Sequence, residues 1–443
     1  DTIIMRFLKS ILRSGFFLLP FLLPTLAFGQ DTIDTGDTAW ILTSSALVLF
    51  MTIPGLSLFY AGLVRSRNVL SVLMHCFVLT AMMSLIWLVV GYSMAFSTAG
   101  MEAGTVGWNS FVGGFDKVFL KGISADSPWG SIPEPLFFVF QMTFFIITPA
   151  LIVGAFAERM KFSAMLWFMA VWSVLVYLPV CHMVWGGGGG FFADMGVIDF
   201  AGGIVVHITA GVAALVACIV VGKRQDYPKK QILPHNLPMT VTGAGMLWVG
   251  WFGFNGGSAL GANGDAAMAI LVTHISASSG ALGWMILEWR KSGRPSVLGI
   301  ATGSIAGLAA ITPASGSVGP LGAVVIGFVS TGLCYWMCTV IKSKFRYDDS
   351  LDVFGVHGVG GFVGTILVAV FAAPSLGGRV EGLVISKQLG VQLFAGVSVA
   401  VYTLIISFVI LKVLQKTIGL RVSENDERGG LDLNSHGESA YND

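Results

Sequence analysis

Two histidines stand in similar settings within otherwise apolar stretches of the sequence. His207 follows Asp199 at the start of one stretch, and His357 follows Asp352 at the start of another. A neutral imidazole offers one hydrogen-bond donor and one acceptor. Two imidazoles in contact would line a narrow passage with directional polarity but no fixed charge. Such a passage suits a small neutral molecule that both donates and accepts hydrogen bonds, whereas an alkali cation needs an oxygen-rich substitute for its hydration shell.

The two aspartates allow two interpretations. An aspartate at a helix start accepts hydrogen bonds from free backbone N–H groups and is favoured by the helix dipole. Asp199 and Asp352 could therefore be helix caps alone, or they could also act on a nearby cation. At about 1.5 Å per residue, each histidine would lie roughly 8–12 Å along its helix from its aspartate.

A second group of candidates combines aromatic rings with a hydroxyl. Its members are Phe140, Phe144, Phe145, Trp185, Phe252, Phe254 and Ser258. Aromatic faces attract cations, so these residues could form a vestibule that recruits one. The alternative is packing or an interfacial belt, which is the commoner reason for such clusters in a chain with 12% aromatic residues.

The elements that must position these residues are membrane helices. The chain has 443 residues, of which 55% are hydrophobic and 11% are charged. Soluble domains carry about 25% charged residues, so this chain has too few to cover a water-facing globule. Its 57 glycines suit close packing between helices in lipid. The net charge of +1 argues against nucleic-acid binding, which usually needs a basic excess.

Eleven apolar stretches are long enough to cross a bilayer, which takes about 20 residues. They are 39–63, 70–97, 134–156, 162–184, 199–222, 237–258, 266–288, 295–313, 318–341, 353–374 and 388–416. Their length, and the lack of ten-residue alternating segments, exclude an outer-membrane barrel.

The basic residues predict the orientation of these stretches. With an external N-terminus, the odd-numbered connections and the tail would be internal, and they hold 18 of the 25 lysines and arginines. The even-numbered connections hold only Lys117, Lys121, Arg379 and Lys387. Internal loops are enriched in lysine and arginine, so this distribution favours eleven crossings with the N-terminus outside and the C-terminus inside.

The two Asp–His segments lie five crossings apart, so one begins on the outer side and the other on the inner side. This placement indicates an inverted repeat of the first five crossings against the next five, around a site near the membrane midplane. We therefore expect an all-α membrane protein of 11 transmembrane helices, with an inverted 5+5 repeat and a final helix.

The N-terminal residues 1–29 are typical of a secretory signal peptide. Arg6, Lys9 and Arg13 precede an apolar run over 16–26, and small residues in 27–29 suit cleavage after Gly29. Residues 1–4, ahead of Met5, are interpreted as an upstream artefact. We expect a membrane domain over 30–418 and a polar internal tail over 419–443.

Enzymatic chemistry finds no support in the sequence. It contains no HExxH or GxSxG motif and no paired catalytic carboxylates. The five cysteines lie in apolar stretches without a CxxC pair, which favours core thiols over a disulfide or metal role. We expect no enzyme activity, cofactor or metal.

Nine segments, in order and correctly spaced, resemble the bacterial Amt branch of the Amt/Mep/Rh ammonium transporter family. They are FMTIPGLSLFYAGLVRSRNVLS (50–71), LIVGAFAERMKFSA (151–164), HMVWGGGG (182–189), DFAGGIVVHI (199–208), PHNLPM (234–239), GWFGFNGGSA (250–259), ITPASG (311–316), DVFGVHGVGG (352–361) and GLRVSENDERGGLDLNSHGESAY (419–441). The resemblance implies eleven spans, a homotrimer with one pore per subunit, and a place in the cell inner membrane.

The resemblance also implies roles for the candidate residues on the outer side. Phe144, Trp185 and Ser258 match an outer site that recruits ammonium. Asp199 matches the acid below that site, which stabilises the cation and helps to deprotonate it. Phe144 and Phe254 match a stacked gate.

Deeper in the membrane, His207 and His357 match the family's pair of pore histidines, and Asp352 matches the inner, pseudo-symmetric partner of Asp199. The implied activity is uptake of ammonium nitrogen as NH3, with or without the proton. The implied partner is a PII-class signalling protein at the cytoplasmic face, and the tail is regulatory. An ammonium sensor of the same fold and a carbon dioxide channel are the alternatives.

Overall fold

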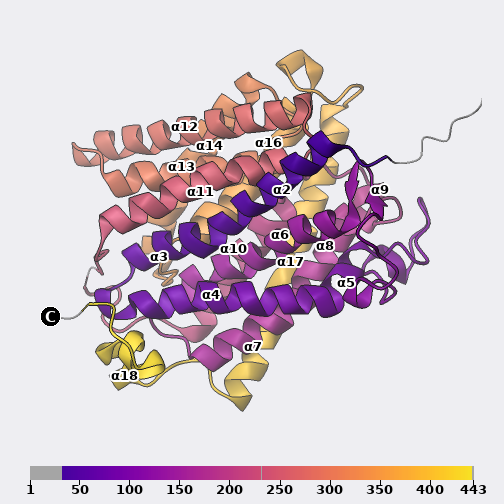
Figure 1. Cartoon of the computed structure of the whole chain (residues 1–443). Helices are drawn as coiled ribbons and strands as arrows, with labels where there is room; N and C mark the ends of the chain where they lie inside the picture. The colour runs from indigo at the N-terminus through magenta and orange to yellow at the C-terminus, as the bar shows by residue number, and fades with distance from the viewer. Residues whose placement is uncertain (1–31, 231, 442–443) are drawn as a thin grey trace, which may run out of the picture.

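The computed structural model describes residues 32–230 and 232–441, and it is predominantly helical. The predicted signal peptide, residues 1–29, lies outside the described residues. In the described part, the only strands are β1 (Pro128–Trp129) and β2 (Ile132–Pro133), which pair as a short antiparallel hairpin. Figure 1 shows long helices running side by side through the molecule.

Helices lie on all eleven predicted stretches. Those of the first five are α2 (Thr35–Phe50), α3 (Ser57–Leu63), α4 (Val69–Ile86), α5 (Tyr92–Phe96), α6 (Glu134–Phe156), α7 (Phe162–Trp172), α8 (Leu178–Trp185) and α10 (Thr209–Val221). Those of the other six are α11 (Leu237–Gly257), α12 (Gly264–Ser292), α13 (Val297–Ile311), α14 (Pro320–Trp336), α16 (Val359–Phe371) and α17 (Ile385–Thr417). The short helix α15 (Lys342–Phe345) directly follows the ninth stretch.

Within the described ranges, nine helical runs are long and apolar enough to cross a membrane. The two remaining stretches are helical but fall short of that criterion. Helix α13 has only 15 residues, and the glycine-rich α11 has 21 residues but is not among the nine. The chain is thus a multi-pass membrane protein.

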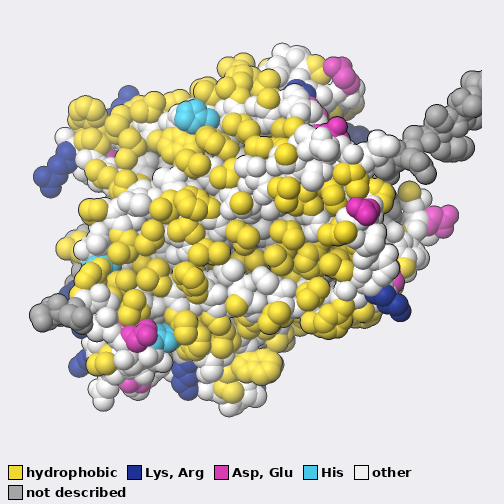
Figure 2. Space-filling model, in the orientation of Figure 1, with side chains coloured by type: hydrophobic (Ala, Val, Ile, Leu, Met, Phe, Trp, Pro, Cys, Tyr) yellow, Lys and Arg dark blue, Asp and Glu magenta, His cyan; other side chains and the backbone are white. Residues whose placement is uncertain are grey.

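The surface of the helical bundle is apolar along its length. Large hydrophobic side chains such as Phe77, Leu85 and Trp167 are more than half exposed. In Figure 2, hydrophobic side chains cover the middle of the molecule, and most of the visible charged ones lie toward its two ends. This distribution fits a bundle whose sides contact lipid and whose ends contact water.

The two ends of the bundle differ in structure. One end, here called the tail face, carries α18 (Glu424–Gly429) and the rest of the C-terminal segment (Figure 1). The opposite end, called the loop face, carries the long connection between α5 and α6, together with α9 (Phe191–Asp194). These names locate the cavities described below.

The two histidine-bearing helices cross at a pair of glycines. Each helix begins with a π-helical turn, η8 (Gly203–Ile208) before α10 and η10 (Phe354–Gly358) before α16. A Cβ atom on Gly211 would lie 2.2 Å from the Cα of Gly358. Only residues without a side chain allow this approach, which brings the two π-helical turns together.

Candidate transport pathway

A vestibule of about 180 Å³ opens at the loop face, and its lining includes three of the four residues expected at the outer site. It is lined by Phe96, Trp129, Phe137, Gln141, Phe144, Trp185, Phe200, Ser258 and Leu260. The rings of Phe144 and Trp185 meet edge to face, with centroids 5.8 Å apart and planes at 84°. Phe144, Trp185 and Ser258, which are distant in sequence, therefore line the same cavity.

Backbone contacts hold the polar groups of the vestibule. Trp185 ends α8, and its Nε1 donates to the carbonyl oxygen of Asp199 at 2.8 Å. Ser258 directly follows α11, and its Oγ donates to the carbonyl oxygen of Phe254 at 2.8 Å. Because the Ser258 proton is used in this way, the hydroxyl oxygen keeps its acceptor capacity for a ligand.

Asp199 is a helix cap, one of the two roles allowed by the sequence. One carboxylate oxygen accepts the N–H groups of residues 202 and 203, at 3.1 and 2.5 Å. The other accepts those of residues 204 and 205, at 2.8 and 3.1 Å. The side chain therefore satisfies four N–H groups at the start of η8. Asp199 itself does not line the vestibule, and it reaches Trp185 through its main chain.

Two phenylalanine rings, with planes tilted at 44° to each other, close the inner end of the vestibule. The ring centroids of Phe144 and Phe254 are 4.4 Å apart, and each side chain is only 1% exposed. Phe254 also lines a second cavity of about 10 Å³, together with His207 and His357. That volume holds about one water-sized molecule, so the pathway narrows sharply at this point.

The two predicted histidines are in direct contact. The Nδ1 atoms of His207 and His357 are 3.3 Å apart, and both side chains are buried. His207 also stacks on Trp251, with ring centroids 5.5 Å apart, and its Nε2 has no hydrogen-bond partner among the residues that the structure describes. In a neutral pair, one Nδ1 carries the shared proton and the other accepts it, so the two Nε2 atoms have opposite hydrogen-bonding roles.

A cavity of about 480 Å³ lies on the tail-face side of the histidines. Its lining includes His357, Tyr60, Arg224, Lys342 and Asp352. His357 thus borders both this cavity and the narrow one. A vestibule, a phenylalanine pair, a histidine pair and a wide cavity follow one another between the two faces.

The acid in the position equivalent to Asp199 is Asp349, which the sequence analysis missed. Asp199 and Asp349 each precede their histidine by eight residues. The Asp349 side chain is buried, and its Oδ2 accepts the N–H of Phe354 at the start of η10 at 2.8 Å. Equal spacing to the histidines was the signal that could have identified it.

Asp352, chosen from the sequence for this role, has a different environment. Its side chain is 33% exposed and pairs with Lys342, with Nζ and Oδ1 2.7 Å apart. It lines the tail-face cavity and caps no helix start with its carboxylate. Burial, by contrast, raises the pKa of the Asp349 carboxyl to about 6, although Lys342 acts to lower it.

Comparison with known proteins agrees with this geometry. The model of the Ammonium Transporter Family matches residues 39–441. The chain belongs to the ammonium transporter family. An ammonium transporter of Aquifex aeolicus is 48% identical over 416 residues, covering 93% of this chain and 95% of the relative. An ammonium transporter of Bacillus subtilis is 45% identical, covering 93% of this chain and all of the relative.

Solved structures resemble this transporter-family chain over most of its length. A sensor Amt protein has a TM-score of 0.83 at 30% identity, covering 90% of this chain and 98% of its own. Mep2 of Saccharomyces cerevisiae has a TM-score of 0.80 at 34% identity, covering 89% of each chain. Family membership supports ammonium transport across a membrane.

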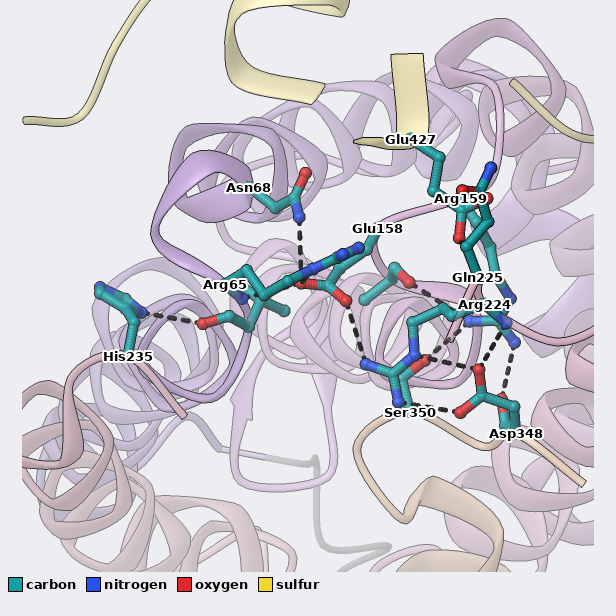
Figure 3. Close-up of polar contacts among 12 residues, drawn as sticks. Arg65, Asn68, Glu158, Arg159, Arg224, Gln225, His235, Asp348, Ser350 and Glu427 are labelled. Atoms are coloured by element: carbon teal, nitrogen blue, oxygen red, sulfur yellow. Dashed lines mark hydrogen bonds and ion pairs between the residues drawn. The ribbon is translucent and has the colours of Figure 1, made fainter. Parts of the chain in front are cut away.

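The tail face of this family member holds a buried network of charges, which Figure 3 shows. Glu158 pairs with Arg65 and Arg224, each at 3.0 Å, and Arg224 also pairs with Asp348 at 2.8 Å. Burial acts to raise the pKa of Glu158, but the two arginines outweigh it and hold that pKa below its usual 4.5. The network joins four connections between helices, and Asp348 directly precedes the cap Asp349.

The C-terminal segment is bonded into the same network. Asn68 donates to Glu158 at 3.0 Å and accepts the N–H of Leu431 at 2.8 Å. Asp432 accepts the N–H groups of Leu70 and Ser71 near the start of α4, at 3.0 and 2.7 Å. The segment is thus an ordered part of the tail face that contacts connections far away in sequence.

Proposed function

We propose that the chain conducts ammonium nitrogen through the pathway between the two faces. NH4+ binds among Phe144, Trp185 and Ser258 in the loop-face vestibule and loses a proton there. NH3 then passes the phenylalanine pair and the histidines. The observation that carries this proposal is the buried contact between His207 and His357 at the narrowest part of a series of cavities.

The narrow cavity explains why the proton must leave the nitrogen. Its lining is largely apolar, and moving an ion into such surroundings costs several kcal/mol or more. Neutral ammonia avoids that cost and exchanges hydrogen bonds with the imidazoles as it passes. Deprotonation of NH4+ yields NH3 and H+, and the proton either returns to the loop side or crosses along the histidines.

We further propose that the chain crosses the cell inner membrane eleven times. The loop face would then lie outside and the tail face in the cytoplasm. Helices on all eleven stretches support the count, and the 18 basic residues of the odd-numbered connections and the tail support the orientation. Resemblance to the family supports a homotrimer with one pore in each subunit.

Within the pathway, we assign Asp199 and Asp349 to the paired positions at the starts of the two histidine-bearing helices. Their equal spacing from the histidines and their caps on η8 and η10 support this assignment. Asp352 instead balances Lys342 in the wall of the tail-face cavity. The symmetric placement of Asp199 and Asp349 fits an inverted repeat around the histidine pair.

For the tail face, we propose a PII-class signalling protein as a partner that closes the exit and a regulatory role for the C-terminal segment. The cavity of about 480 Å³ at this face offers room for an inserted loop. The bonds from the segment to Asn68 and to the start of α4 hold it at the same face as this cavity, which supports a contact with such a partner.

The test is a current recording from purified protein in liposomes on a solid-supported membrane. A saturable, ammonium-triggered current is expected from the natural chain if charge crosses with the nitrogen. With neutral conduction, only the pH change inside the liposomes would report transport.

The His207→Ala, His357→Ala double variant tests the histidine assignment. It should lose transport or its exclusion of potassium, because the cavity loses its hydrogen-bonding groups. Normal transport with selectivity intact would contradict the assignment.

A sensor is the second candidate, because one of the similar solved structures is a sensor Amt protein. Saturable ammonium binding without either a current or a pH change in the liposomes would favour sensing over conduction. Movement of carbon dioxide without ammonium would instead favour a gas channel.

A further inference from the structure

Asp37, in the first turn of α2, lies between two segments that form the loop-face vestibule. Its Oδ1 accepts the N–H of Ala262 at 2.7 Å, and its Oδ2 accepts the hydroxyl of Ser131 at 2.5 Å. Ala262 and Ser131 belong to different walls of the vestibule. One carboxylate therefore bonds to both walls.

The wall on the Ala262 side carries the vestibule hydroxyl. Ala262 lies in the turn between α11 and α12, and the same turn contains Ser258 and Leu260, which line the vestibule. A second residue of α2 supports this wall, because Nε1 of Trp40 donates to the carbonyl oxygen of Gly256 at 3.1 Å.

The wall on the Ser131 side carries the aromatic rings. Ser131 lies in the turn of the β1–β2 hairpin, and β2 leads directly into α6. Helix α6 supplies Phe137, Gln141 and Phe144 to the vestibule. The backbone of α2 adds a bond here too, from the N–H of Asp34 to the carbonyl oxygen of Ser131 at 2.8 Å.

We propose that Asp37 is a positioning residue that sets the distance between Ser258 and the rings of α6, and so sets the affinity of the vestibule for ammonium. The inference rests on the proposed function of the vestibule. An ammonium ion must contact a hydroxyl oxygen and aromatic faces together, so a small change in their separation weakens binding. Phe254 and the histidine pair line the narrow cavity beyond the vestibule, and in the described part of the chain they are not hydrogen-bond partners of Asp37.

The chemistry of the carboxylate explains why an acid occupies this position. Both partners are donors, and a carboxylate offers an acceptor oxygen to each. An asparagine would keep one acceptor for Ala262 and present an N–H₂ group to Ser131, whose hydroxyl can turn to accept. An alanine would leave both walls without the connection.

The experiment measures half-saturation by ammonium and maximal transport in the Asp37→Ala, Asp37→Asn and Ser131→Ala variants in liposomes. Asp37→Ala should raise half-saturation about threefold to tenfold with little change in maximal transport, because binding geometry is lost and the deeper pathway is kept. Asp37→Asn and Ser131→Ala should each give a smaller rise.

Asp34→Ala is the matched control. Asp34 caps the same helix, its carboxylate accepting the N–H of Asp37 at 2.8 Å, and that carboxylate bonds to neither wall. If Asp34→Ala raises half-saturation as much as Asp37→Ala, the effect comes from α2 as a whole, and the proposal is wrong.

A Ser258→Ala variant separates this proposal from the proposed function. If Ser258→Ala raises half-saturation and Asp37→Ala does not, the vestibule binds ammonium and only the role of Asp37 is refuted. If neither changes it, the vestibule is not the ammonium site, and both proposals fail.

Discussion

At the scale of single residues, the histidine pair combines polarity with the absence of a fixed charge. The shared proton between the Nδ1 atoms leaves one Nε2 as a donor and the other as an acceptor, one after the other along the pathway. A molecule that donates and accepts hydrogen bonds can be passed between them. A bare cation finds no ring of oxygen atoms to replace its water.

Placing a carboxylate at the pair should therefore weaken selectivity. We expect His207→Asp or His357→Glu to conduct but to exclude potassium about tenfold less well, because a carboxylate coordinates a bare cation better than an imidazole does. The measurement is the ammonium-triggered current in the presence and absence of excess potassium. Unchanged selectivity in both variants would contradict this explanation.

Asp349 should make stability depend on pH in a defined direction. Its pKa is raised to about 6 from 3.8, so its contribution to stability is complete below about pH 4 and is lost as the pH rises through 6. Asp349→Asn keeps an acceptor for Phe354 and cannot ionise. Between pH 4 and 7, the free energy of unfolding of the variant should rise relative to that of the natural chain by on the order of 1–3 kcal/mol. The measurement is the melting temperature of both proteins in detergent across that pH range. A difference between them that does not change with pH would refute this prediction.

At the scale of helices, the sequence predicts where a helix lies and how long it is better than it predicts π-helical turns within it. The stretch 134–156 coincides with α6 along its whole length, because an apolar run in lipid must be helical to satisfy its own backbone. The π-helical turns η8 and η10 were not predicted, since one wider turn leaves no periodic trace in a uniformly apolar run.

Because π-helical turns could not be predicted, the sequence did not show that Asp349, and not Asp352, caps η10. Asp352 is nearer to η10 in sequence, and a helix cap was one of the two roles that the sequence allowed for it. The backbone at Asp352 is left-handed, with φ of 59°, and Asp349 accepts the free N–H group instead. The sequence suggested an aromatic vestibule among seven candidates, and the family resemblance selected Phe144, Trp185 and Ser258 from them. The lining of this vestibule comes from six separate segments of the chain, whose meeting depends on tertiary packing.

The glycine crossing between the histidine-bearing helices should tolerate no side chain. We expect Gly211→Ala to destabilise the protein by about 1–3 kcal/mol and to lower transport, because the new methyl group would overlap Gly358. Thermal unfolding and liposome transport measure the two effects.

Gly245 provides the control for that substitution. It lies in the interior of α11 with nothing within 4 Å of an added Cβ atom. Gly245→Ala should therefore be neutral or stabilising by up to about 1 kcal/mol, because alanine favours the helix. Equal effects at positions 211 and 245 would show that the crossing does not limit the approach of the helices.

At the scale of the whole molecule, the charges at the tail face hold distant connections together. Glu158 lies between Arg65 and Arg224, and Asn68 connects it to the C-terminal segment. Removing one partner from such a buried group leaves the others uncompensated, which costs more than a surface ion pair contributes.

Glu158→Gln should therefore destabilise the protein near neutral pH by about 3 kcal/mol. Because the pKa of Glu158 is held below 4.5, the stability it contributes is present above that pH and is lost as the pH falls through the lowered value. The difference in melting temperature from the natural chain should shrink in acid. A difference that stays constant from pH 7 to pH 3 would contradict this account.

The bonds from Asp432 to the start of α4 also have a consequence for biosynthesis. They join residues 361 and 362 positions apart. The N–H groups at the start of α4 can therefore gain these partners only after the chain has been synthesised as far as Asp432, when all the long apolar helices have already been made. A polypeptide truncated before Asp432 would lack these bonds, so the contact separates chains that reach this residue from chains that do not.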